Sequence, residues 1–142
     1  MKTAKLALVL LLAVMLVAGI ACTSLTSLSV DNVSVGWDNI VYTYYLSNIT
    51  FELKNTGYSR ARYDSVEIYA NDELVGSKDD IILFSAFDPG KTHTFEFKRC
   101  KTGLDCLHEY SAYGQELIKL KIIIRDGSDI IAIYSDTVTP TQ

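Results

Sequence analysis

The stretch Asn48–Gly57, which reads Asn-Ile-Thr-Phe-Glu-Leu-Lys-Asn-Thr-Gly, is the feature that most constrains how this chain can fold. Ile49, Phe51 and Leu53 alternate with polar residues, so a period of two places the three apolar side chains on one face of an extended segment. The closing Asn-Thr-Gly ends the segment, because Asn and Gly accept backbone conformations that β-branched residues resist. The stretch therefore predicts a core β-strand that ends in a turn.

The first 21 residues have the composition of a signal peptide. Lys2 and Lys5 precede a run from Leu6 to Ala21 that carries no charge, which is the typical order of a basic region, an apolar region and small residues. The run of about 16 residues is shorter than the roughly 20 that a transmembrane helix needs. We therefore expect export with removal of residues 1–21, and a retained single-span anchor is the alternative.

Cys22 follows directly on the small residues Gly19 and Ala21. The sequence Ala-Gly-Ile-Ala-Cys is similar to a bacterial lipobox, in which the cysteine becomes the lipidated first residue of the mature protein. This resemblance implies a lipid anchor at Cys22, a polar tether over residues 22–28, and a membrane-anchored protein that faces the outside or the periplasm. One acyl chain gives only marginal attachment, so stable anchoring requires a diacylglycerol group or a second signal. Ordinary signal-peptidase cleavage nearby is the alternative.

Charge and cysteine content limit the compartment and the partners. The chain of 142 residues has 13 basic and 17 acidic residues, and without residues 1–21 it keeps 11 basic against 17 acidic, a net charge of −6. An acidic surface argues against nucleic acid and anionic lipid as partners. With Cys22 assigned to the anchor, Cys100 and Cys106 remain, and an oxidising compartment would join them, which would stabilise the fold by roughly 2.4 kcal/mol. The lone pair does not match a zinc site, and we expect no metal or cofactor.

The domain is assigned to residues 29–142, and its N-terminal part predicts two strands. Val30–Val35 predicts a first strand with an irregular interior, and Gly36–Asn39 predicts a turn, with Trp37 as a core residue beside it. Ile40–Leu46 is rich in residues that suit a pleated sheet. We expect it to run into the core strand, with a bulge near Ser47.

The remaining segments predict two hairpins, a further strand and an inserted loop. The Asn-Asp pair at 71–72 tolerates the positive φ that a tight hairpin needs, and residues 99–115 do not alternate, so we expect a loop there with one helical turn near Leu107–Tyr113. About seven short strands predict an all-β, immunoglobulin-like antiparallel β-sandwich. The predicted strands are Ser65–Ala70, Glu73–Lys78, Thr92–Lys98, Ile118–Ile124 and Ile130–Val138.

Three segments in this order carry a family resemblance. They are Ile49-Thr-Phe-Glu-Leu-Lys-Asn-Thr-Gly57, Val66-Glu-Ile-Tyr-Ala-Asn-Asp-Glu-Leu-Val-Gly76 and Asp88-Pro-Gly-Lys-Thr-His-Thr-Phe-Glu-Phe97. Together they resemble the CARDB domain, the cell-adhesion-related domain of bacterial and archaeal surface proteins, over residues 29–138. The resemblance implies an immunoglobulin-like sandwich, and the cysteine-bearing loop is longer than the family pattern. A late-embryogenesis-abundant stress sandwich is the alternative, although such domains usually have Asn-Pro where this chain has Asn-Thr.

The sequence offers no catalytic constellation, since His93 and His108 have no nucleophile at a recognisable spacing. We therefore expect a non-catalytic cell-surface or envelope module that binds an envelope or extracellular protein or glycan. An accessory subunit of an envelope complex differs from it only in the partner. Tyr110 and Tyr113, in the loop Arg99–Gln115, offer contact area of the kind enriched at interfaces. The alternative is that both tyrosines only cap one end of the sandwich.

Two asparagines begin glycosylation sequons. Asn32 precedes Val-Ser and Asn48 precedes Ile-Thr, which are acceptor sequences in exported proteins. Occupancy of either site depends on its exposure and on the host.

Overall fold

The computed structural model describes residues 27–79, 88–101, 103, 105–114 and 116–140. Within these residues the chain forms nine strands and no helix. The strands are β1 (Leu28–Ile40), β2 (Thr43–Asn55), β3 (Ser65–Ala70), β4 (Glu73–Lys78), β5 (Thr92–Arg99), β6 (Cys106–Leu107), β7 (Ser111–Tyr113), β8 (Ile118–Asp126) and β9 (Asp129–Val138). The signal peptide, Cys22 and most of the tether lie outside the described residues. The described residues contain no helix that is long and apolar enough to cross a membrane.

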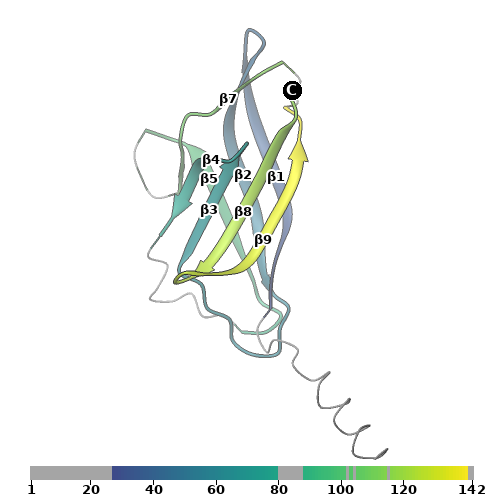
Figure 1. The fold of residues 1–142 in the computed structure, drawn as a ribbon, viewed down its shortest axis with the longest axis vertical. Helices are drawn as coiled ribbons and strands as arrows, with labels where there is room; N and C mark the ends of the chain where they lie inside the picture. The colour runs from purple at the N-terminus through teal and green to yellow at the C-terminus, as the bar shows by residue number, and fades with distance from the viewer. Residues whose placement is uncertain (1–26, 80–87, 102, 104, 115, 141–142) are drawn as a thin grey trace, which may run out of the picture.

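The strands form two layers around one core, as expected for an immunoglobulin-like sandwich (Figure 1). The strand order is β1-β2-β5-β6-β4-β3-β8-β9, and β7 pairs with β2. Strand β6 joins the layers, because it runs parallel to β5 and meets β4 through the single pair Gly76 and Leu107. The predicted sandwich is confirmed, and the inserted loop adds two short strands and one parallel pairing to the strands that were predicted.

Strand β2 lies at the centre of its layer and has the predicted register. Ile49, Phe51 and Leu53 are buried, and the Phe51 ring stacks on Phe95 of β5 with 5.0 Å between the ring centroids. The Asn55 side chain explains the turn that follows, because its Oδ1 accepts a hydrogen bond from the Gly57 N–H (3.0 Å) and its Nδ2 donates to the Ser59 carbonyl (2.9 Å). Local side-chain bonds of this kind favour a turn over a longer strand.

Both predicted hairpins are confirmed. Asn71 and Asp72 adopt φ of 48° and 65° between β3 and β4, as a two-residue hairpin turn requires. Strands β8 and β9 pair along their whole length, with one bulge opposite Ile124 and Arg125. The inward faces of β3 and β8 form this side of the core, and partly buried side chains of β9 pack against it. The buried residues of β3 and β8 are Val66, Ile68, Ala70, Ile118, Leu120, Ile122 and Ile124.

The predicted turn at Gly36–Asn39 is wrong, because β1 continues through it to Ile40. Gly36 pairs with Asn48, and a Cβ on Gly36 would overlap the Asn48 Oδ1. This glycine therefore permits close packing between strands and does not form a turn. The bulge predicted near Ser47 is confirmed, since the register shifts by one residue there. Trp37 is half-buried and packs against the core from within β1.

The helical turn predicted near Leu107–Tyr113 is also wrong. This segment is extended, and its backbone groups bond to strands that are distant in sequence. The His108 N–H donates to the Val75 carbonyl (2.7 Å), and the Leu46 N–H donates to the Tyr110 carbonyl (3.0 Å). These non-local bonds take the place of helical ones, so the loop lies flat across one end of the sandwich.

Candidate functional site

The sandwich has two poles, and the chain enters the domain at one of them. Leu28 and the β8–β9 turn lie at this entry pole, while the β1–β2 hairpin and β7 lie at the opposite pole, which we call the apical pole (Figure 1). Strand β1 has 13 residues, so the poles are separated by roughly 40 Å at about 3.3 Å per residue. A partner bound at the apical pole would be far from any anchor that precedes Leu28.

The β1–β2 hairpin turns through Val41 and Tyr42, which adopt φ of 48° and 66°. The Asn71–Asp72 turn has nearly the same angles, but Asn and Asp tolerate them and a β-branched Val does not. Val41 is 83% exposed and Tyr42 is 72% exposed, so burial does not offset the backbone strain. The turn therefore carries large apolar side chains at a cost in stability.

Strand β7 brings one of the two predicted tyrosines to this turn. Tyr113 pairs with Thr43, and the Gly114 N–H donates to the Tyr42 carbonyl (3.0 Å). The Tyr113 side chain is 73% exposed beside the turn. We call four exposed, large hydrophobic side chains at this pole the apical patch, which consists of Ile40, Val41, Tyr42 and Tyr113.

The other predicted tyrosine has a structural role. Tyr110 is half-buried, and its ring packs on Trp37 with 6.5 Å between the centroids. Its hydroxyl accepts a hydrogen bond from the Asn71 Nδ2 (3.1 Å). Burial raises the pKa of the Tyr110 hydroxyl, and the nearby Glu116 carboxylate adds to this rise. Tyr110 therefore holds the loop against the sandwich, as the capping interpretation describes, and Tyr113 alone is available for contact.

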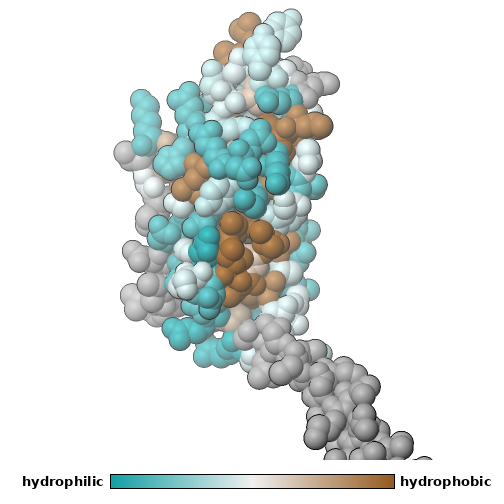
Figure 2. Space-filling view, in the orientation of Figure 1, coloured by the Kyte–Doolittle hydropathy of each residue, from teal (hydrophilic) through white to brown (hydrophobic). Residues whose placement is uncertain are grey.

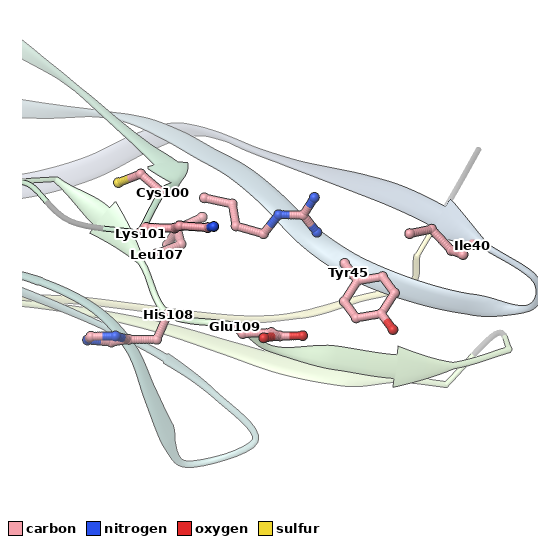
Figure 3. Close-up of a pocket in the computed structure, with 8 residues that line it drawn as sticks. Ile40, Tyr45, Cys100, Lys101, Leu107, His108 and Glu109 are labelled. Carbon is pink, nitrogen blue, oxygen red and sulfur yellow. The ribbon is translucent and has the colours of Figure 1, made fainter.

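A groove of about 680 Å³ runs from the apical patch toward the disulfide loop (Figure 3). Figure 3 shows Ile40 and Tyr45 toward one end, and Cys100, Lys101 and Leu107 toward the other. The groove is mixed in character, since aliphatic, aromatic, cationic and acidic side chains all line it. Its lining residues are Ile40, Tyr45, Arg99, Cys100, Lys101, Leu107, His108 and Glu109.

Arg99 is held in the groove by two neighbours. Its Nη2 lies 3.0 Å from the Asp38 Oδ2, and its guanidinium carbon lies 5.7 Å from the centre of the Tyr45 ring. Both partners of the ion pair are exposed, so it contributes at most about 1 kcal/mol. The interaction orients Arg99, and Lys101, His108 and Glu109 are the other exposed polar side chains that line the groove.

Cys100 and Cys106 form a disulfide, with 5.3 Å between their Cα atoms. The bond connects the segment that carries Arg99 to the segment that carries Leu107, and both segments line the groove. Lys78 of β4 adds a second connection, because its Nζ lies 2.8 Å from the Asp105 Oδ1. The disulfide therefore fixes the separation of two groove walls.

The two predicted glycosylation sites lie in different environments. Asn32 is exposed in a bulge of β1, where it has φ of 52° and its Nδ2 donates to the Glu52 Oε2 (2.7 Å). Asn48 lies between two paired strands, opposite Gly36 on one side and Lys98 on the other. Asn32 is therefore the more accessible acceptor, and its occupancy stays a prediction.

The two histidines lie in different environments. The His93 Nδ1 lies 2.8 Å from the hydroxyl of the buried Tyr63, whose pKa burial raises to about 12. His108 is exposed in the groove. Across the described residues, no three His, Cys, Asp or Glu side chains lie together in a way that could hold a metal ion.

The apical turn was not predicted from the sequence. The run Ile-Val-Tyr at 40–42 contains no turn residue, and its β-branched and aromatic side chains indicate a strand. The one available signal is the loss of alternation, since three consecutive large apolar residues cannot all face the core of a two-layer sandwich.

Comparison with known proteins shows the fold. No family model matches the chain, and no curated protein matches it. Among solved structures, the CARDB domain of a Pyrococcus furiosus protein, in complex with di-metal ions, is 10% identical; the match covers 84% of this chain and 97% of that one, with a TM-score of 0.52. The chain has a CARDB-like fold. At 10% identity the similarity concerns the fold alone.

Two further matches have lower scores. A solution structure of the same Pyrococcus domain is 10% identical over 82% of this chain and 94% of that one, with a TM-score of 0.45. A β-glucuronidase from Ruminococcus gnavus is 15% identical over 81% of this chain and 16% of that one, with a TM-score of 0.39.

Proposed function

We propose that this protein is a non-catalytic surface module that is anchored at its entry pole and binds an envelope or extracellular partner through the apical patch. The observation that supports this proposal is the composition of the β1–β2 turn. Asn-Gly is the sequence that makes a tight turn of this kind most stable. The chain instead has Val41 and Tyr42, whose side chains are exposed and whose backbone has an unfavourable positive φ. Strain of this kind is common at functional sites.

The surroundings of the patch fit a binding surface. Aromatic side chains are enriched in the centres of protein interfaces and at their energetic hot spots, and this pole has two exposed tyrosines, since Tyr113 pairs with Thr43, the residue after Tyr42. Binding residues are often found on loops that a rigid scaffold supports. The CARDB-like fold supports the same proposal, because such a sandwich leaves its loops and edges as the available contact surfaces.

Site-specific photocrosslinking in cells tests this proposal. A benzoylphenylalanine at position 42 or 113 should form covalent adducts with envelope components, which mass spectrometry then identifies. Position 58 is the matched control, because Tyr58 is 86% exposed and follows Thr56, whose N–H bonds to the Ser27 carbonyl at the entry pole. Adducts that form equally at position 58, or that are absent from positions 42 and 113, would contradict the proposal.

A further inference from the structure

Strand β9 forms the end of the strand order and has one unpaired edge. Within the described residues it pairs only with β8. Strand β1 approaches β9 from the other layer (Figure 1), and both strands pack inward-facing side chains against the core. The outer edge of β9 therefore presents backbone donors and acceptors that no described strand uses.

This edge lacks most of the features that prevent strands from pairing between molecules. Natural edges are commonly protected by lysine, proline, bulges or inward-pointing charges. Strand β1, at the other end of the order, has two register shifts and a positive φ at Asn32. Strand β9 contains no lysine, arginine or proline over its 10 residues, and its one bulge lies near its start.

A side-chain bond shows which backbone groups of β9 face outward. The Thr137 N–H donates to the Asp136 Oδ1 (2.7 Å), so it points away from β8. Because this orientation alternates along an antiparallel strand, the N–H groups of Ser135 and Ile133 also point outward. Asp136 blocks the edge at Thr137, and the bulge interrupts it at the other end. The bulge leaves Ile131 without a partner on β8, so the open stretch is Ala132–Ser135.

An exposed apolar area adjoins this open stretch. Ile130 is 52% exposed and Ile133 is 59% exposed, and Ile123 of β8 lies directly opposite Ile133. Figure 2 shows an apolar area over the lower part of β8 and β9, with hydrophilic side chains around it. Such an area beside a free edge fits strand addition, because the added strand pairs with the backbone and covers the side chains.

We propose that β9 pairs with β9 of a second copy of this chain, antiparallel and centred on Ile133. In this register Ile133 meets its own copy and Ala132 meets Tyr134. The open stretch Ala132–Ser135 carries no charged side chain, so no like charges meet within it. The register uses the outward N–H and C=O groups of Ile133 and leaves the Asp136–Thr137 bond intact. The edge is thus complementary to itself, and the isoleucines of both copies form one apolar area.

Cysteine crosslinking of the full chain in detergent tests both the contact and its register. Directly opposed residues of a hydrogen-bonded antiparallel pair have Cα atoms about 5.5 Å apart, which is within the range for a disulfide. Ile133→Cys should therefore shift the protein to twice the monomer mass on a non-reducing gel, and reductant should reverse the shift. The matched control is Ser135→Cys, whose two copies would be separated by about 14 Å along and across the strands.

The outcomes separate the possible occupants of the edge. A dimer with Ile133→Cys and a monomer with Ser135→Cys support the proposal, and Ile133→Lys should then convert the wild-type dimer to monomer in sedimentation. Equal crosslinking of both cysteine variants would indicate random collision or aggregation and would overturn it. A monomer with either cysteine would also overturn it and would leave an extended peptide of another protein as the occupant. None of these results depends on the apical patch, so the proposed function is tested separately.

Discussion

Replacement of the apical turn by Asn-Gly should stabilise the domain while it removes half of the apical patch. The double variant Val41→Asn/Tyr42→Gly places residues that tolerate positive φ where the backbone already has φ of 48° and 66°. A left-handed conformation costs roughly 1–2 kcal/mol for an ordinary residue, so the change recovers about 2–3 kcal/mol in total. This gain is the main term.

Two smaller terms oppose the gain. Val41 and Tyr42 are 83% and 72% exposed, and full burial of a large apolar side chain contributes roughly 1.5–3 kcal/mol, so their loss costs about 1 kcal/mol together. A glycine also makes the unfolded chain more flexible, which costs about 0.5–1 kcal/mol. The net expectation is a gain of about 1 kcal/mol, or a rise in Tm of about 4 °C.

Thermal and urea unfolding of the purified variants measure this gain. Tyr113→Ala is the control, because it removes an exposed side chain at the same pole and has no positive φ. It should change the stability by less than about 0.5 kcal/mol. If the double variant unfolds at or below the wild-type temperature, the turn is not strained, and the main support for the apical patch is lost.

Three further predictions concern the core, the anchor and the disulfide. Phe51→Ala should destabilise the domain by roughly 3–5 kcal/mol and Glu52→Ala by less than about 0.5 kcal/mol. If denaturant melts rank the two variants in the reverse order, the register of the strand is shifted by one residue. Intact mass of the membrane fraction should exceed the polypeptide from Cys22 by a lipid increment, and an unmodified soluble product would exclude the anchor. Non-reduced peptide mapping should join Cys100 to Cys106, and two free thiols in the exported protein would reject this pairing.

The parts of the fold that were predictable are those where one face of a strand is buried. Ile49, Phe51 and Leu53 could be assigned from alternation alone, because a shift of one residue would expose all three. The Asn71–Asp72 turn was predictable for a different reason, since its residues suit its backbone angles. In both places local preference and the tertiary structure agree.

The parts that were missed depend on contacts between distant segments. Gly36 suggests a turn in isolation, and only its pairing with Asn48 shows that the missing side chain makes room for a neighbour. The short strands β6 and β7 have two and three residues, which is too few for periodicity to appear. The apical turn was missed because the side chains of Val41 and Tyr42 indicate a strand, whereas their backbone adopts the positive φ of a tight turn.

Antiparallel pairing of β9 would have a consequence for an anchored protein, because the two copies run in opposite directions. The entry pole of one copy would lie beside the apical pole of the other. The two entry poles would therefore be separated by roughly 40 Å, the length of β1. A tether over residues 22–28 spans at most about 25 Å when fully extended. Two copies anchored in one membrane could therefore not pair in this way, whereas copies on two facing surfaces could. The apical patch of each copy would then face the surface that carries its partner, where an exposed turn of Val41 and Tyr42 is well placed to make contact.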